Sequence, residues 1–153
     1  MKKLRRPSLL LPVLAATALL FSACNKEAAE PTTMFPAGTA YTTLRFGTVL
    51  AQGGVMSGGM LAVVKATDGT EYVQFKPDFY TDFHTGSLGI YLAKSNDLVR
   101  NQRAANPANV VRVGTITQSG AQLLPISGTS AGFSHVILHC DAAQYNFGAA
   151  ALQ

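Results

Sequence analysis

From residue 41 onward, short apolar runs alternate with polar segments that contain glycine, and long helical periods are rare. Short runs that are rich in β-branched, aromatic and leucine side chains and end in turn residues are typical of strands. The runs of this kind cover residues 43–51, 59–66, 71–76, 88–94, 109–116, 121–126, 135–140 and 145–152. Short strands at this spacing predict an all-β fold, a single antiparallel β-sandwich of the jelly-roll-like kind.

Turn residues between these runs predict how two pairs of strands are connected. Asp68 and Gly69 lie between the second and third runs, and this dipeptide is typical of a tight hairpin turn with positive φ. Ser119 and Gly120 predict a second hairpin between the fifth and sixth runs. Residues 95–109 are polar and contain Pro107, so we expect a long loop with one helical turn at most.

The first residues of the chain have the features of an export signal. An apolar run at residues 9–21 ends in small residues and is preceded by Lys2, Lys3, Arg5 and Arg6. The run is too short to span a bilayer comfortably, and a charged start before it is typical of a secretory signal. The stretch "LLFSAC", residues 19–24, resembles the lipobox of bacterial lipoproteins, whose cysteine becomes the lipidated first residue of the mature chain.

This resemblance predicts a signal peptide at residues 1–23 and a lipid anchor on Cys24. The protein would then be a lipoprotein of the bacterial cell envelope, held in a membrane, most simply the outer one, and facing the periplasm or the surface. An ordinary peptidase cut nearby is the alternative, and it would leave Cys24 as a plain thiol. Residues 24–40 are polar and interrupted by prolines, which predicts a flexible tether before a single domain at residues 41–153.

The charge of the whole chain gives a misleading impression of the mature protein. The formal net charge is +4, from twelve basic and eight acidic residues. Four of the basic residues lie in the predicted signal, so the remaining chain has eight residues of each sign. A strongly basic face for nucleic acid therefore has no support, and we expect no nucleic-acid partner.

The chain has two cysteines, and lipidation of Cys24 would leave Cys140 without an intramolecular partner. Side chains alternate between the two faces of a strand, so the run at residues 135–140 directs Cys140 to the same face as Val136 and Leu138. Two interpretations stay open. Cys140 is either an inert core residue or a thiol that is kept for redox chemistry.

The histidines are the candidate partners of Cys140. His139 points to the opposite face unless the strand ends or bulges between the two residues. His84 lies in the turn-like stretch at residues 80–87 and is the histidine most free to approach Cys140. His135 and His139 would lie roughly 13 Å apart on a strand and cannot chelate one ion together. We therefore predict no metal site from these residues.

The remaining candidate chemistry is sparse. Met56 and Met60 flank a Ser-Gly-Gly turn and either fill the core or, with a histidine, bind Cu(I). The sequence has no phosphate-binding glycine loop, no H-E-x-x-H and no C-x-x-C-H. The acidic residues are dispersed, so paired carboxylates for glycoside hydrolysis are not visible.

The segment "SHVILHCDAAQYNFGAAAL", residues 134–152, resembles the end of the electron-transfer DM-thirteen domain. That family carries an apolar run, a cysteine and a Phe-Gly-Ala segment there, which match Cys140, Phe147 and Gly148 here. The stretches "GGVMSGGMLAVV", "EYVQFKPDF" and "GIYLAKS" resemble its earlier strands in the same order. Where the family has Gly-Pro-Asp-Leu, this chain has "TGSL", so Ser87 replaces the aspartate.

The resemblance covers residues 46–152 and implies a lipid-anchored redox accessory domain of the cell envelope. Cys140 would carry electron transfer as a bare thiol or as the ligand of a prosthetic group such as non-covalently bound haem, together with a redox partner protein. His139 and His84 are the residues expected to assist Cys140, and His139 is the second candidate cofactor ligand. The alternative is a non-catalytic adhesion or assembly module in which Cys140 packs in the core.

Overall fold

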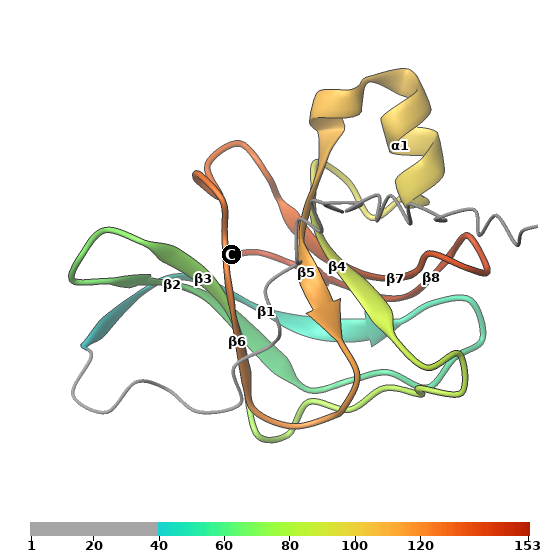
Figure 1. Ribbon diagram of the computed structural model, residues 1–153, viewed down its shortest axis with the longest axis horizontal. Coiled ribbons are helices and arrows are strands. Elements are labelled where there is room, and N and C mark those ends of the chain that lie inside the picture. Colours follow the sequence, from blue (N-terminus) through green and yellow to red (C-terminus); the bar gives the residue numbers. More distant parts are fainter. Residues whose placement is uncertain (1–39) are drawn as a thin grey trace, which may run out of the picture.

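A computed structural model describes residues 40–153, which form a β-domain with one short helix (Figure 1). The strands are β1 (Tyr41–Ala51), β2 (Met60–Ala66), β3 (Glu71–Phe75), β4 (Leu88–Ala93), β5 (Val110–Ile116), β6 (Gln122–Pro125), β7 (His135–Cys140) and β8 (Tyr145–Ala151). They form one antiparallel sheet in the order β5-β4-β7-β8-β1-β2-β3-β6, which confirms the all-β prediction and all of the predicted strands. The predicted signal peptide, Cys24 and nearly all of the tether lie outside the described residues.

Strand β1 belongs to both halves of the sheet. Its residues 41–48 pair with β2, and its residues 49–51 pair with β8. The β2-β3-β6 half and the β8-β7-β4-β5 half therefore face each other as in a sandwich, joined through one shared strand. The main core lies between them and contains fully buried side chains from both halves, among them Phe75, Leu124, Ile90 and Leu138.

A smaller apolar cluster lies on the outer face of β4 and β7, beneath α1 (Val99–Ala105). Tyr91, Ala93 and Ile137 pack there with Val99 of the helix. All residues of β4 are buried, because one face meets the main core and the other meets this cluster. Burial on both faces accounts for the unbroken apolar sequence of β4, which a half-exposed strand would not need.

The helix corrects the expectation of a loop at residues 95–109. The segment forms α1 and a 3-10 turn at Pro107–Asn109. Only Val99 and Gln102 of α1 are buried, so its apolar signal is weak. Gln102 Nε2 donates to the carbonyl oxygens of Ser95 and Asp97, and these bonds hold the helix to the end of β4. Within residues 40–153, no helix is long and apolar enough to cross a membrane.

The two predicted hairpins have different outcomes. Gly69 has a φ of +92° and turns the chain between β2 and β3, which pair in register, so this prediction is confirmed. Gly120 also turns the chain, with a φ of +90°. However, β5 pairs with β4 and β6 pairs with β3, at the two ends of the strand order. The turn carries the chain from one half of the fold to the other, so the predicted β5–β6 hairpin is wrong.

Candidate functional site

The C-terminal hairpin of β7 and β8 holds the predicted site residues, and it places Cys140 and His139 on opposite faces. Cys140 is 1% exposed and belongs to the main core with Val136 and Leu138. Ile137, which lies on the other face, packs in the cluster beneath α1. This arrangement is the alternation that the sequence predicts. His139 is therefore not positioned to act on the Cys140 thiol.

The sulfur of Cys140 has one polar contact, with the turn that follows β7. The backbone N–H of Ala143 donates to Sγ over 3.3 Å. Residues 141–144 form an exposed turn, and Gln144 has a φ of +59° and donates its N–H to the Cys140 carbonyl. Apolar side chains enclose the sulfur on the core side, and this turn covers it on the solvent side.

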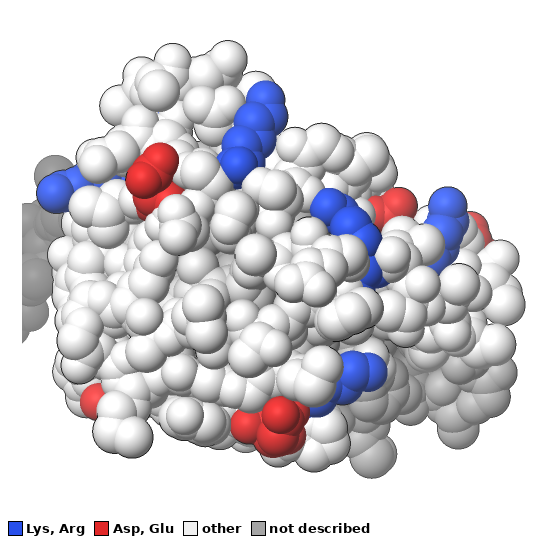
Figure 2. Space-filling model, turned by 180° about the vertical axis from the view of Figure 1, so that it is seen from behind, with Lys and Arg blue, Asp and Glu red and all other residues white. Residues whose placement is uncertain are grey.

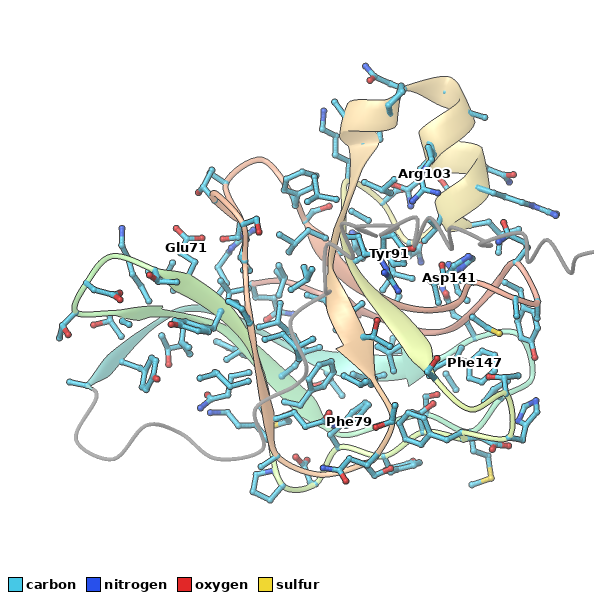
Figure 3. The ribbon with its side chains drawn as sticks, viewed as in Figure 1. Glu71, Phe79, Tyr91, Arg103, Asp141 and Phe147 are labelled. Atoms are coloured by element: carbon cyan, nitrogen blue, oxygen red, sulfur yellow. The ribbon has the colours of Figure 1, made fainter. Side chains whose placement is uncertain are left out.

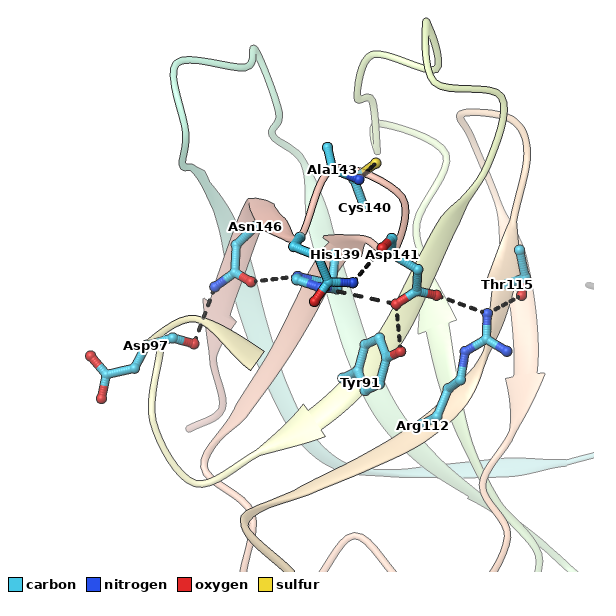
Figure 4. A network of polar contacts seen from close by, with 10 residues as sticks. Tyr91, Asp97, Arg112, Thr115, His139, Cys140, Asp141, Ala143 and Asn146 are labelled. Carbon is cyan, nitrogen blue, oxygen red and sulfur yellow. Dashed lines mark hydrogen bonds and ion pairs between the residues drawn. The ribbon is translucent and has the colours of Figure 1, made fainter. Parts of the chain in front are cut away.

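His139 is fully buried and lies in a network of polar groups on the outer face of the sheet (Figure 4). Its Nδ1 lies 2.9 Å from Asn146 Oδ1. The Asn146 amide nitrogen donates to the carbonyl oxygens of Asp97 at 3.2 Å and Asn96 at 3.4 Å. Since Asn146 Oδ1 is then an acceptor, Nδ1 of His139 carries the proton, and Nε2 is unprotonated in the neutral ring.

Nε2 of His139 faces the carboxylate of Asp141, and Oδ1 lies 4.0 Å away. Burial lowers the pKa of His139, and this effect outweighs the opposing influence of Asn146 and of Asp141. Arg103 and Arg100 of α1 lower the pKa further. The neutral ring is therefore the form that the folded protein favours.

Asp141 is the centre of the network because it accepts from two other strands. The Tyr91 hydroxyl donates to Oδ1 over 2.7 Å, and Arg112 donates to Oδ2 over 3.2 Å. Arg112 also donates to the Thr115 hydroxyl at 2.9 Å. Burial raises the pKa of Tyr91, and its hydrogen bond to Asp141 adds to this effect. The network thus ties β4, β5 and the end of β7 together.

Tyr91 also contacts α1, and the labelled side chains of Tyr91, Arg103 and Asp141 gather at the end of the molecule where the helix lies (Figure 3). The Arg103 guanidinium lies 5.6 Å from the centre of the Tyr91 ring, and the Tyr91 and His139 rings are nearly perpendicular, with centres 5.7 Å apart. Gly89 leaves room for the group. A Cβ there would lie 2.7 Å from the Tyr91 ring and 2.9 Å from Asp141 Oδ2.

A β-bulge in β8 brings Asn146 to His139. Leu138 pairs with Gly148, whereas the next residue, His139, pairs with Asn146, so Phe147 is an extra residue in β8. Bulges of this kind redirect side chains locally. Here the bulge leaves Phe147 fully buried in the main core while Asn146 joins the polar network.

His84 lies elsewhere and has its own partners. Its Nδ1 is 2.8 Å from Asp82 Oδ2, and both side chains are about half exposed. The His84 ring stacks on Phe147, with ring centres 5.6 Å apart and an angle of 18°. The backbone N–H of His84 and its ring both lower the pKa of Asp82. The structure therefore pairs His84 with Asp82 and Phe147 and does not bring it to Cys140.

The two methionines that flank the Ser-Gly-Gly turn do not fill the core. Met56 and Met60 are 77% and 42% exposed, so the core-filling interpretation is wrong.

Residues 128–132 read Gly-Thr-Ser-Ala-Gly, which matches the G-x-S-x-G spacing of a nucleophile elbow. That elbow requires a turn from a strand into a helix. Ser130 instead lies buried in a loop, where its N–H donates to Glu71 at 2.7 Å.

Three surface hollows of the described residues have linings that do not include Cys140. The one nearest to the hairpin measures about 320 Å³ and is lined by Gln52, Gly53, Asn96, Leu98, Tyr145 and Asn146. Two others lie beside α1 and beside the start of β1, and Cys140 lines none of the three. A haem does not fit at Cys140, because the residue is 1% exposed and packs among apolar side chains of the main core. Among residues 40–153, no group of three or more His, Cys, Asp or Glu side chains could hold a metal ion.

Comparison with known proteins adds no assignment. No protein family, curated protein or solved structure matches the chain. The geometry of the described residues therefore carries the functional argument. That geometry consists of a shielded thiol on one face of the hairpin and a polar network on the other. The sequence alone did not identify Tyr91, Arg112 or Asn146 as members of the network.

Proposed function

We propose that the protein is a lipid-anchored module of the bacterial cell envelope that acts by binding rather than by thiol chemistry. The observation that carries this proposal is the enclosure of Cys140, which is 1% exposed and packs among apolar side chains of the main core. A reactive thiol needs a base or cation beside it and access to its substrate. Both histidines that were candidates for that role have other partners.

The envelope location comes from the sequence at Cys24. A charged start, a short apolar run and a Ser-Ala-Cys ending support export and lipidation together. Fractionation of cells that produce the full chain tests this part. We expect the protein in the membrane fraction and Cys24→Ser in the soluble fraction. A membrane-bound Cys24→Ser variant, or a wild-type protein without added lipid mass, would contradict the anchor.

A second candidate function is electron transfer through Cys140 as a thiol, as the resemblance to the DM-thirteen domain implies. One observation favours it: the Ala143 N–H points at Sγ, and a backbone donor stabilises a thiolate. If the turn at residues 141–144 moved enough to expose Sγ while it kept the Ala143 N–H bond, the thiolate could attack a disulfide of a partner protein. A mixed disulfide would form, and the partner's second sulfur would leave as a thiolate.

Alkylation of the native protein separates the two candidates. We expect Cys140 to resist iodoacetamide in the folded protein and to react fully in urea, because the reagent cannot reach a side chain that is 1% exposed. The matched control is Cys140→Ser, which should take up no label in either state. We also expect Cys140→Ser to keep its binding partners in a membrane pull-down. Rapid labelling of the folded protein, or a mixed disulfide with a partner that Cys140→Ser loses, would favour electron transfer instead.

A further inference from the structure

Several large apolar side chains are exposed on the described domain. Six are exposed there: Leu44, Phe46, Leu50, Met56, Met60 and Tyr80. Leu44 lies in a bulge of β1 and lines a hollow with Thr42 and Lys65. We call the other five the β1 patch: Phe46, Leu50, Met56, Met60 and Tyr80.

The pairing of the strands places the members of the β1 patch side by side. Phe46 and Leu50 flank Thr48 on the outer face of β1, because Val49 between them points into the main core. Met60 pairs directly with Thr48, so it lies diagonally between the two. Diagonal neighbours on one sheet face are close enough for long side chains to touch. These three residues therefore form one continuous apolar surface.

Tyr80 extends this surface, and Met56 precedes it closely along the chain. Tyr80 pairs with Gly58, two residues before Met60. A Cβ on Gly58 would lie 2.6 Å from the Tyr80 hydroxyl oxygen, so the ring rests directly on the glycine backbone. Met56 lies two residues further back and is the most exposed member, at 77%.

The β1 patch carries no charged side chain of its own. The charged residues bound to the Met60 backbone are Lys76, through its N–H, and Asp78, through its carboxylate, which are one of each sign. In Figure 1, β1 lies behind β5 and β6. Figure 2 shows the molecule from the opposite side, and on that side charged side chains are sparse and lie mostly toward the edges. The occupant of this face is therefore selected by apolar contact rather than by charge.

The patch is too small for a stable dimer on its own. A specific interface between two proteins uses about 20–30 residues on each side, whereas the β1 patch has five large side chains. A surface of this size can hold a partner only when the partner is already held nearby. The bilayer that receives the predicted lipid anchor meets this condition.

The connection from the anchor leads directly into β1. Residues 24–40 end where β1 begins, and seventeen residues reach about 60 Å at most. A domain of about 110 residues has a radius of gyration of roughly 13 Å, so the outer face of β1 can reach the membrane. We infer that Phe46, Leu50, Met56, Met60 and Tyr80 rest on the surface of the bilayer that holds the lipid anchor. This inference depends on the lipid anchor of the proposed function.

A fluorescence experiment tests the inference, because the chain contains no tryptophan. Leu50→Trp places a single reporter in the β1 patch, and Ala104→Trp places a matched reporter on the exposed part of α1. Each variant is purified from cells as the mature protein and reconstituted into phosphatidylcholine vesicles with and without brominated acyl chains. We expect bromolipid to quench Leu50→Trp at least threefold more strongly than Ala104→Trp, since bromine quenches only tryptophan that touches acyl chains.

Two additional variants and a change of lipid make the test specific. Phe46→Ser with Met60→Ser, in the Leu50→Trp background, should reduce quenching to the Ala104→Trp level. Leu44→Ser in the same background should leave quenching unchanged, because Leu44 lies outside the patch. Addition of phosphatidylglycerol should also leave it unchanged, because the patch is uncharged.

The possible failures are distinguishable. If the protein does not sediment with the vesicles, the lipid anchor is wrong and the inference fails with it. If the protein sediments but both reporters are quenched equally, the anchor stands and membrane docking is wrong. If Leu50→Trp is unquenched and a crosslinker captures dimers that Phe46→Ser with Met60→Ser abolishes, a second copy of the chain covers the patch and docking is wrong.

Discussion

The two faces of β7 show how differently neighbouring residues of one strand can be used. On the inner face, Leu138 and Cys140 are enclosed by apolar side chains from both halves of the domain. On the outer face, His139 is hydrogen-bonded to Asn146, and its Nε2 faces the carboxylate of Asp141. The inner face gains stability from burial alone, whereas the outer face depends on every polar group finding its partner. The faces should therefore respond to different perturbations.

Phe147→Ala should have the largest effect, because it removes a fully buried ring from the inner side. We expect the free energy of unfolding to fall by about 3–5 kcal/mol, the usual cost of such a cavity. Urea unfolding followed by circular dichroism measures it. Leu50→Ala, at an exposed position, is the control and should change stability by less than about 0.5 kcal/mol. A similar cost for the two variants would show that the inner face does not carry stability.

Two double-mutant cycles test the polar network on the outer face. Asp141→Asn is one of the two substitutions in both cycles. With Tyr91→Phe, the cycle should give a coupling energy of about 1 kcal/mol, because the Tyr91 hydroxyl is buried and donates to a carboxylate. With Arg112→Gln, it should give about 0.5 kcal/mol or less, because that ion pair is nearly half exposed. Equal couplings in the two cycles would contradict the central role of the Tyr91 bond.

The outer face should also respond to pH through His139. Its pKa in the folded protein is lowered below the ordinary value of 6.5. As the pH falls through about 6.5, the unfolded chain therefore binds a proton that the folded protein does not. The free energy of unfolding should decrease between pH 7.5 and pH 5.5. The loss of stability continues down to the lowered pKa of the folded state.

His139→Asn should make that decrease smaller, since asparagine does not titrate and can still donate to Asn146. Burial also lowers the pKa of His135, so His135→Asn serves as the comparison. Each single variant keeps the other histidine, so the free energy of unfolding should still decrease somewhat with falling pH in both. Chemical unfolding at several pH values provides the measurement. A wild-type protein that gains stability on acidification over this range would overturn the assignment.

His84→Gln should have the smallest effect. The His84 side chain is half exposed, and its ion pair with Asp82 lies in solvent, where such pairs contribute little. We expect a change in stability below about 0.5 kcal/mol and no change in the labelling of Cys140. Faster labelling of Cys140 in His84→Gln would show that the His84 loop shields the thiol.

Local pattern was enough to predict the strands and the two faces of β7. Strand alternation depends only on backbone geometry, so the separation of His139 from Cys140 follows from their adjacency. The β2–β3 hairpin follows from Gly69 for the same local reason. The helix α1 was missed because it buries only Val99 and Gln102, too few apolar positions to produce a periodic signal.

The polar network and the strand order depend on residues that are far apart in the sequence. Tyr91 and Asp141 are separated by 50 positions, and Arg112 and Asp141 by 29. Nothing local marks such pairs, because each of these residues is ordinary on a solvent-exposed strand. The absence of pairing between β5 and β6 has a similar origin. The turn at Gly120 defines a change of direction, but the closure of the whole sheet decides which neighbours pair.

Because β1 pairs with both β2 and β8, its two neighbours are synthesised at different times. Phe46 exchanges two backbone hydrogen bonds with Gln153, which follows β8, and a Cβ on Gly47 would lie 2.4 Å from the Ala151 carbonyl oxygen. β1, the first strand of the described domain, therefore lacks one of its neighbours until β8 has been synthesised. Contacts between such distant segments form slowly, so we expect the β1–β8 edge to close late in folding. A product truncated by even ten residues would expose an open edge on β1 and be a substrate for proteolysis.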